Sequence, residues 1–152
     1  MLDEERPIRY RQTIEFVEQQ LADWIQSHPE AFPLRTTDGR WREAPANHAC
    51  DDDGFLVGLL WQFYQQTGLA QWQQAAERYG RLLEKQMGQS PSNSLSRSCL
   101  YSHLPWFEAT KDRQRRAVIF EAAADVAHRF HHQGRFFAAA TSPNVLQIST
   151  MM

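Results

Sequence analysis

The chain has 152 residues, of which 42% are hydrophobic and 22% charged, values typical of a single globular domain. A net charge of −2 and a pI of about 6.3 exclude the basic composition of a nucleic-acid-binding module, and two cysteines are too few for a disulfide framework or a four-thiolate metal site. The N-terminal segment MLDEERPIRY lacks the apolar core of a signal peptide, and no stretch approaches the roughly 20 apolar residues of a membrane helix, so we expect a cytoplasmic protein that binds neither membranes nor nucleic acids.

Apolar residues spaced by three and four predict a first helix from Pro7 to Ser27. The His28-Pro29 pair ends it, because a residue before proline is pushed out of the α region. Residues 29–53 are predicted to be a loop that contains an Asp38-Gly39 turn signal. Loops of about 25 residues without secondary structure are uncommon in compact domains and often line a functional site.

The next stretch, FLVGLLWQFY, is apolar nearly all round and predicts a buried helix that begins at Gly54 and ends at Thr67-Gly68. Asp52 or Asp53 is a suitable N-cap, since a carboxylate accepts hydrogen bonds from the free N–H groups of the first turn. An amphipathic third helix is expected from Ala70 to Met87.

A short, apolar fourth helix is predicted from Leu100 to Ala109, with Pro105 inside it, and an amphipathic fifth helix from Asp112 to His131. We find no segment with the period-two alternation of a strand. Buried and amphipathic helices alternate, and the segments around helices two to three and four to five are weakly similar. This pattern predicts one all-α domain over residues 1–152, built from repeated helical hairpins.

The segments FPLRTTDGRW and DDDGFLVGLLWQFYQQTGLAQWQQAAERYGRLLE resemble the opening of the unsaturated glucuronyl hydrolases, glycoside hydrolase family 88. The matching features are Phe32-Pro33, Asp53-Gly54-Phe55, Gly58-Leu59-Leu60-Trp61 and Thr67-Gly68. The segment LYSHLPWFEATKDRQRRAVIFEAAADVAHRF is similar to the second hairpin of the family. The resemblance covers about residues 30–140, which is less than half of a family member.

This resemblance implies an (α/α)6 toroid of six helical hairpins. It also implies hydrolysis of oligosaccharides, generated by polysaccharide lyases, that carry an unsaturated uronic acid at the non-reducing end. Family members hydrate the vinyl-ether double bond, use an aspartate as general acid and base, and need no metal or organic cofactor.

The chain departs from the family pattern at its catalytic positions. Alignment on Leu100-Tyr101-Ser102 places Ser96 at a catalytic aspartate and Leu95 at the preceding histidine. Serine does not titrate near neutral pH and cannot replace a carboxylate acid or base. A second family aspartate lies in a third hairpin that this sequence does not show, and a family tryptophan is replaced by Asp51.

The remaining acids, Asp53 and Asp52, are therefore the candidate catalytic residues, and helix capping is the alternative role for both. Trp41 and His48 in the long loop are candidate sugar-binding residues, with packing against the helix ends as the alternative. We expect Trp61 and Tyr64 to belong to the core. His128, His131 and His132 have helical spacing, but no Cys or acid at matching spacing completes a zinc site. The Ser102-His103 pair lacks a visible third partner for a nucleophile, and neighbours on a helix do not face each other.

Two functions remain open. The first is an unsaturated glucuronyl hydrolase, incomplete and weakly active or inactive as this chain. The second is a non-catalytic or truncated helical-repeat protein that binds a sugar or a protein partner, and an unrelated helical hairpin repeat is a third interpretation. An incomplete toroid leaves an apolar edge open, which predicts self-association.

Overall fold

The computed structural model describes residues 5–44, 53–87, 95–139 and 142–146. They fall into two compact units, one within residues 1–46 and the other within residues 47–152. Most of these residues are helical, which confirms the predicted all-α class. The expected single domain stays a prediction.

The first unit begins with the helix α1, Glu5–Ser27, which ends at the predicted residue. The ring of His28 then stacks on Trp24, with centroids 3.9 Å apart and planes 8° from parallel. Leu21, Trp24 and Phe32 are the buried hydrophobic side chains of this unit. Helix α1 ends just before His28, as expected, because the ring of Pro29 disfavours the helical conformation of the residue before it.

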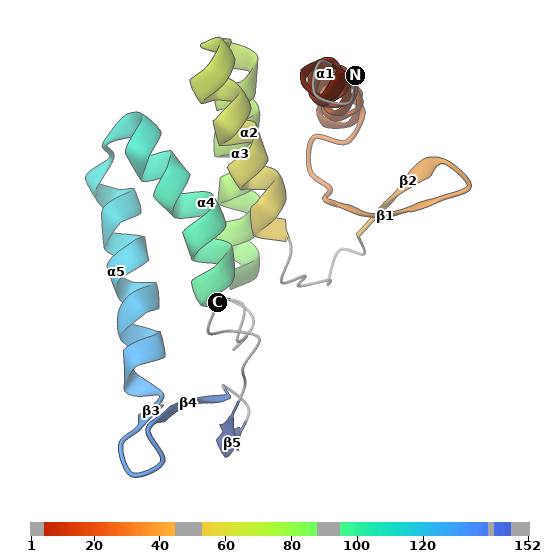
Figure 1. The fold of residues 1–152 in the computed structure, drawn as a ribbon. Helices are drawn as coiled ribbons and strands as arrows, with labels where there is room; N and C mark the ends of the chain where they lie inside the picture. Colours follow the sequence, from red (N-terminus) through yellow and green to blue (C-terminus); the bar gives the residue numbers. More distant parts are fainter. Residues whose placement is uncertain (1–4, 45–52, 88–94, 140–141, 147–152) are drawn as a thin grey trace. The chain divides into compact units, whose positions relative to one another are not determined.

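A β-hairpin follows α1, where the sequence predicted a loop. Strands β1, Pro33–Thr37, and β2, Arg40–Glu43, pair antiparallel (Figure 1). Asp38 and Gly39 join them with φ of 53° and 72°, as in the two-residue type I′ turn that matches the twist of paired strands. Nearly every residue of both strands is exposed, so neither face has the apolar alternation that identifies a strand in a sequence.

The second unit contains two consecutive helical hairpins. The first consists of α2, Asp53–Thr67, and α3, Ala70–Met87. The second consists of α4, Leu95–Thr110, and α5, Arg113–His128. Helix α4 therefore begins before the predicted Leu100 and contains Pro105, and α5 ends before the predicted His131.

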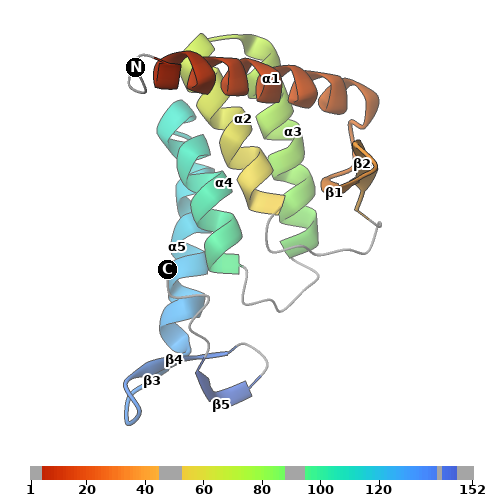
Figure 2. The ribbon, with the colours of Figure 1, turned by 45° about the vertical axis from the view of Figure 1, so that its right-hand side comes forward.

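Helices α2 and α4 are the central pair of this unit. Helix α2 packs against both α3 and α4, and α4 packs against α5, as Figures 1 and 2 show. The buried hydrophobic core comes from all four helices: Val57, Leu60, Trp61, Phe63, Trp72, Ala75, Ala76, Tyr79, Leu83, Cys99, Trp106 and Ala122. Helices α2 and α4 are thus the inner pair and α3 and α5 the outer ones, in agreement with the predicted alternation of buried and amphipathic helices.

The turns inside the two hairpins repeat the same hydrogen bonds, which supports the internal repeat seen in the sequence. The hydroxyls of Thr67 and Thr110 donate to the carbonyl four residues earlier, at 2.7 and 2.9 Å. Each hydroxyl also accepts from the backbone N–H two residues later, at 3.3 Å in both cases. The residues that follow, Gly68 and Lys111, both have positive φ, 67° and 57°. Thus one turn design ends both inner helices.

Three short strands follow α5, and the expectation that the chain contains no strand is therefore wrong here as well. Strand β3, Phe130–His131, pairs with β4, Phe136–Ala139, and β4 pairs with β5, Ser142–Leu146, all antiparallel. The Phe130 ring meets Phe137 edge to face, with centroids 5.1 Å apart. Strands this short carry too few residues for a periodicity signal.

Candidate functional site

Asp53 is the predicted catalytic residue that the structure places most clearly. It is the first residue of α2 and is 5% exposed. At that position the carboxylate lies beside the free N–H groups of the first helical turn, where N-cap side chains lie. This geometry suits the capping role, and the catalytic role stays a prediction. Asp52 lies outside the described residues.

An exposed aromatic pair links the first turn of α2 to the middle of α4. Phe55 of α2 and Tyr101 of α4 are 44% and 37% exposed, and their ring centroids are 4.3 Å apart. Residues two apart on a helix do not share a face, so Phe55 and Asp53 project in different directions. The pair therefore offers an apolar surface on a different face of α2 from the Asp53 carboxylate.

Gly58 allows the backbones of α2 and α4 to approach each other at this place. A Cβ atom at Gly58 would collide with the carbonyl oxygen of Tyr101. A residue without a side chain is therefore required for the Phe55–Tyr101 contact one turn away. The Gly58 match to the family pattern thus has a packing explanation in this chain.

The other predicted site residues are not gathered around Asp53 by the described structure. Trp41 lies on β2 in the first unit, is 41% exposed, and meets Trp24 edge to face with centroids 6.2 Å apart. His48 lies outside the described residues. Ser96 lies in the first turn of α4, so the helix N-terminus is present at the position where the family has an aspartate, but this residue cannot supply the carboxylate.

Of the two expected core positions, Trp61 is confirmed, because it is fully buried. Tyr64 is only partly buried and lies at the edge of the core, where its ring meets Trp61 edge to face with centroids 5.9 Å apart. Ser102 and His103 are also fully buried, although the sequence left their environment open. As neighbours on a helix they project in different directions and cannot form a nucleophile–base pair.

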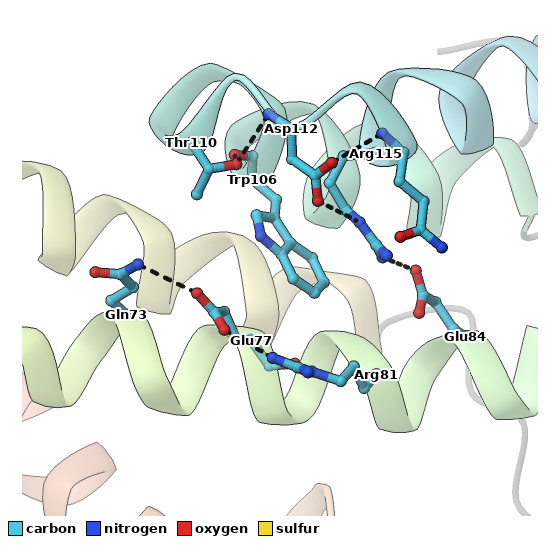
Figure 3. A pocket seen from close by; sticks show the side chains of 9 residues that line it. Gln73, Glu77, Arg81, Glu84, Trp106, Thr110, Asp112 and Arg115 are labelled. Carbon is cyan, nitrogen blue, oxygen red and sulfur yellow. Dashed lines mark hydrogen bonds and ion pairs between the residues drawn. The ribbon is translucent and has the colours of Figure 1, made fainter.

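Sequence reasoning missed a polar groove between α3 and the α4–α5 turn. The groove has a volume of about 600 Å³ and is shown in Figure 3. It is lined by Gln73, Glu77, Arg81, Glu84, Trp106, Thr110, Asp112, Gln114 and Arg115. Its charged residues come from separate helices, so no local sequence motif indicates the groove.

The charged groups of the groove are paired with one another. Arg115 is 6% exposed, forms an ion pair with Glu84, and has its guanidinium 4.2 Å from the centroid of the Trp106 ring. Arg81 binds Glu77 at 2.7 Å. These cations and carboxylates form ion pairs with one another. The main role of the groove side chains is therefore to hold the two adjacent hairpins together, and we call this set of ion pairs the polar clamp.

His103 extends this clamp into the core. Its Nδ1 atom lies 3.7 Å from Oε1 of Glu84, and its ring is parallel to that of Trp106, with centroids 5.9 Å apart. Burial lowers the pKa of His103 from 6.5 to about 4, so the imidazole is neutral near pH 7. With no exposed surface, the side chain cannot touch a substrate.

Within the described residues, no group of three or more His, Cys, Asp or Glu side chains could hold a metal ion. The same part of the chain contains no helix with the length and apolar character needed to cross a membrane. The free thiol of Cys99 is buried in α4, and burial raises its pKa to about 11. Cys99 is therefore an unreactive core residue rather than a nucleophile.

Comparisons with known proteins agree with the fold. No family model matches the chain. No curated protein matches it either. Among solved structures, the chain is similar to an unsaturated glucuronyl hydrolase specific for heparin, with a TM-score of 0.66 and 23% sequence identity over 79% of this chain. The chain spans 32% of the length of that enzyme, whose fold is an (α/α)6 toroid. The similarity therefore shows a glycosidase-like arrangement of helical hairpins.

Proposed function

We propose that this chain is part of a glycoside hydrolase of the unsaturated glucuronyl hydrolase type. Its substrates would be lyase-generated oligosaccharides with an unsaturated uronic acid at the non-reducing end. The observation that carries the proposal is the position of Asp53 at the head of an inner helix, within a fold similar to such an enzyme. A cytoplasmic location is part of the same proposal.

The reaction requires a proton donor and a proton acceptor at a carbon–carbon double bond. A carboxyl group gives its proton to one carbon of the vinyl ether, and the resulting carboxylate takes a proton from the water that adds to the other carbon. Asp53 would start each cycle protonated and would recover its proton from the added water, so one carboxyl group can serve both steps. The hemiketal formed by hydration then opens, and its rearrangement breaks the glycosidic bond. Asp52 is the second candidate for this role.

Substrate contacts would come from exposed aromatic and polar side chains. The half-exposed Phe55–Tyr101 pair offers an apolar surface for the less polar face of a sugar ring. Trp41 and His48 remain proposed sugar-binding residues. Because Ser96 provides no carboxylate, we expect the chain to be weakly active at most.

The test follows the absorbance of the double bond while the purified chain is mixed with an unsaturated uronic disaccharide. General acid–base catalysis contributes about 10²–10⁴-fold, so Asp53→Asn should lower the rate by at least about 100-fold. The matched control is Asp125→Asn. Asp125 is an exposed residue of α5, and its carboxylate lies 3.6 Å from the guanidinium of Arg129, the C-cap of that helix. Its rate should equal that of the parent chain.

Two results would count against the enzyme. Equal rates for the parent and Asp53→Asn would remove the catalytic role of this aspartate. Constant absorbance at high protein concentration, with the chain folded by circular dichroism, would leave the alternative of a non-catalytic helical-repeat protein that binds a sugar or a protein.

A further inference from the structure

The hairpin of β1 and β2 carries an unusual set of basic side chains. Arg35 lies directly opposite Arg42, and Thr37 lies opposite Arg40. Cross-strand partners share a face of a sheet, and residues two apart along a strand also share one. The three arginines therefore project from the same face of the hairpin, and all three are exposed.

Among the residues that the structure describes, no carboxylate forms an ion pair with any of these three guanidinium groups. The nearby acid Glu43 lies 3.4 Å from His28 instead. Like charges placed directly opposite each other destabilise a strand pair. The Arg35–Arg42 pair therefore does not stabilise the hairpin, and binding of an anionic ligand is the better explanation for two arginines at these positions.

We infer that this basic face, formed by Arg35, Arg40 and Arg42, binds an acidic oligosaccharide through its carboxylate or sulfate groups. Guanidinium groups bind such planar or tetrahedral oxyanions with paired hydrogen bonds, and lysine cannot reproduce this fork. The three arginines are also attached close together on the hairpin. Arg40 and Arg42 are about 7 Å apart along the strand, and opposite residues are about 5 Å apart.

Charge complementarity alone would also admit a single-stranded nucleic acid, but the placement of Trp41 disfavours it. Trp41 pairs with Thr36 and therefore projects from the opposite face, where it meets Trp24. The basic face has no aromatic ring on which bases could stack, although proteins that bind single strands combine both. The choice of a sugar as the carrier of the acid rests on the proposed function.

Binding is tested with a saturated hyaluronan octasaccharide, which has no double bond and is therefore not a substrate. Calorimetry at low salt should show binding to the full chain that weakens as the NaCl concentration rises. Neutral maltooctaose should not bind. Exposed ion pairs contribute modestly, so Arg35→Gln/Arg42→Gln should weaken the affinity about tenfold.

The matched control is Arg113→Gln/Arg116→Gln, which removes two exposed arginines of α5 and changes the net charge equally. Its affinity should stay within about twofold of the parent. If the hairpin double variant fails to fold, Arg40→Gln compared with Arg113→Gln makes the same test, with an expected loss of about threefold.

Equal losses in both double variants would overturn the inference, because binding would then follow net charge only. Absence of binding to the octasaccharide, or equal affinity for a thymidine octanucleotide, would overturn it as well. Asp125→Asn, which removes an exposed carboxylate of α5, should bind like the parent. A chain that binds the saturated octasaccharide but leaves double-bond absorbance constant would retain this inference and lose the proposed enzyme.

Discussion

The buried imidazole of His103 should make the stability of the helical hairpins depend on pH. Burial lowers its pKa to about 4, whereas an unfolded chain titrates at the ordinary 6.5. Between these two values the unfolded state binds more protons than the folded state, so the free energy of unfolding falls as the pH falls. Across the whole window the loss is about 3 kcal/mol, and between pH 7 and pH 5 it is about 2 kcal/mol.

The groups packed around His103 limit how far its charge could be compensated. Glu84 is the nearest carboxylate, at 3.7 Å from Nδ1, but it already forms an ion pair with the buried guanidinium of Arg115. Trp106 covers the ring and carries no charge. Desolvation therefore dominates, and the neutral imidazole is the form that fits the core.

The assay is urea unfolding at pH 7, 6 and 5, followed by tryptophan fluorescence, for the parent chain and His103→Phe. The other titrating groups are common to both proteins, so the difference between them isolates this residue. The parent should lose about 2 kcal/mol more than the variant between pH 7 and pH 5. Parallel pH dependences would refute the reasoning, because His103 would then titrate alike in the folded and unfolded states.

Two further predictions concern packing and association. Gly58→Ala should lower the free energy of unfolding by about 1–3 kcal/mol, because the new Cβ collides with the Tyr101 backbone. Gly80→Ala should lower the free energy of unfolding by less, since its Cβ would lie 2.6 Å from the ring of Trp106, a side chain that can shift. Equal urea midpoints for Gly58→Ala and the parent would contradict the close packing at Gly58. Phe120 is 61% exposed on α5, so Phe120→Ser should reduce the predicted self-association in sedimentation velocity. A monomeric parent, or an unchanged dimer fraction, would contradict the open apolar edge.

Helix positions were predictable wherever apolar residues dominate the local pattern. The predicted range of α3, Ala70 to Met87, is the observed one, and α2 begins one residue before the predicted Gly54. The beginning of α4 was missed because LSRSC contains serines and a basic residue rather than an apolar face. Cys99 is nevertheless 2% exposed, so packing against the neighbouring helices overrides the weak local preference.

The β1–β2 hairpin shows a different limit of the sequence pattern. Alternation identifies a strand only when one face is buried, and both faces of this hairpin are largely exposed. The available signal was the Asp38-Gly39 pair flanked by threonines and a tryptophan, which is the strongest short-range indication of a hairpin. Giving that turn chemistry more weight than the missing alternation would have identified both strands.

The candidate site was predictable only where a single position determines it. Asp53 could be placed because the buried helix that follows requires a polar N-terminus. Arginines are different, because the same residue type is buried between Glu84 and Trp106 at position 115 and forms an exposed like-charge pair at positions 35 and 42. Net charge averages over both situations, so a chain of −2 overall still presents a local cationic face. What separates a structural cation from a ligand-binding one is its partner across space, and strand register and helix packing determine that partner.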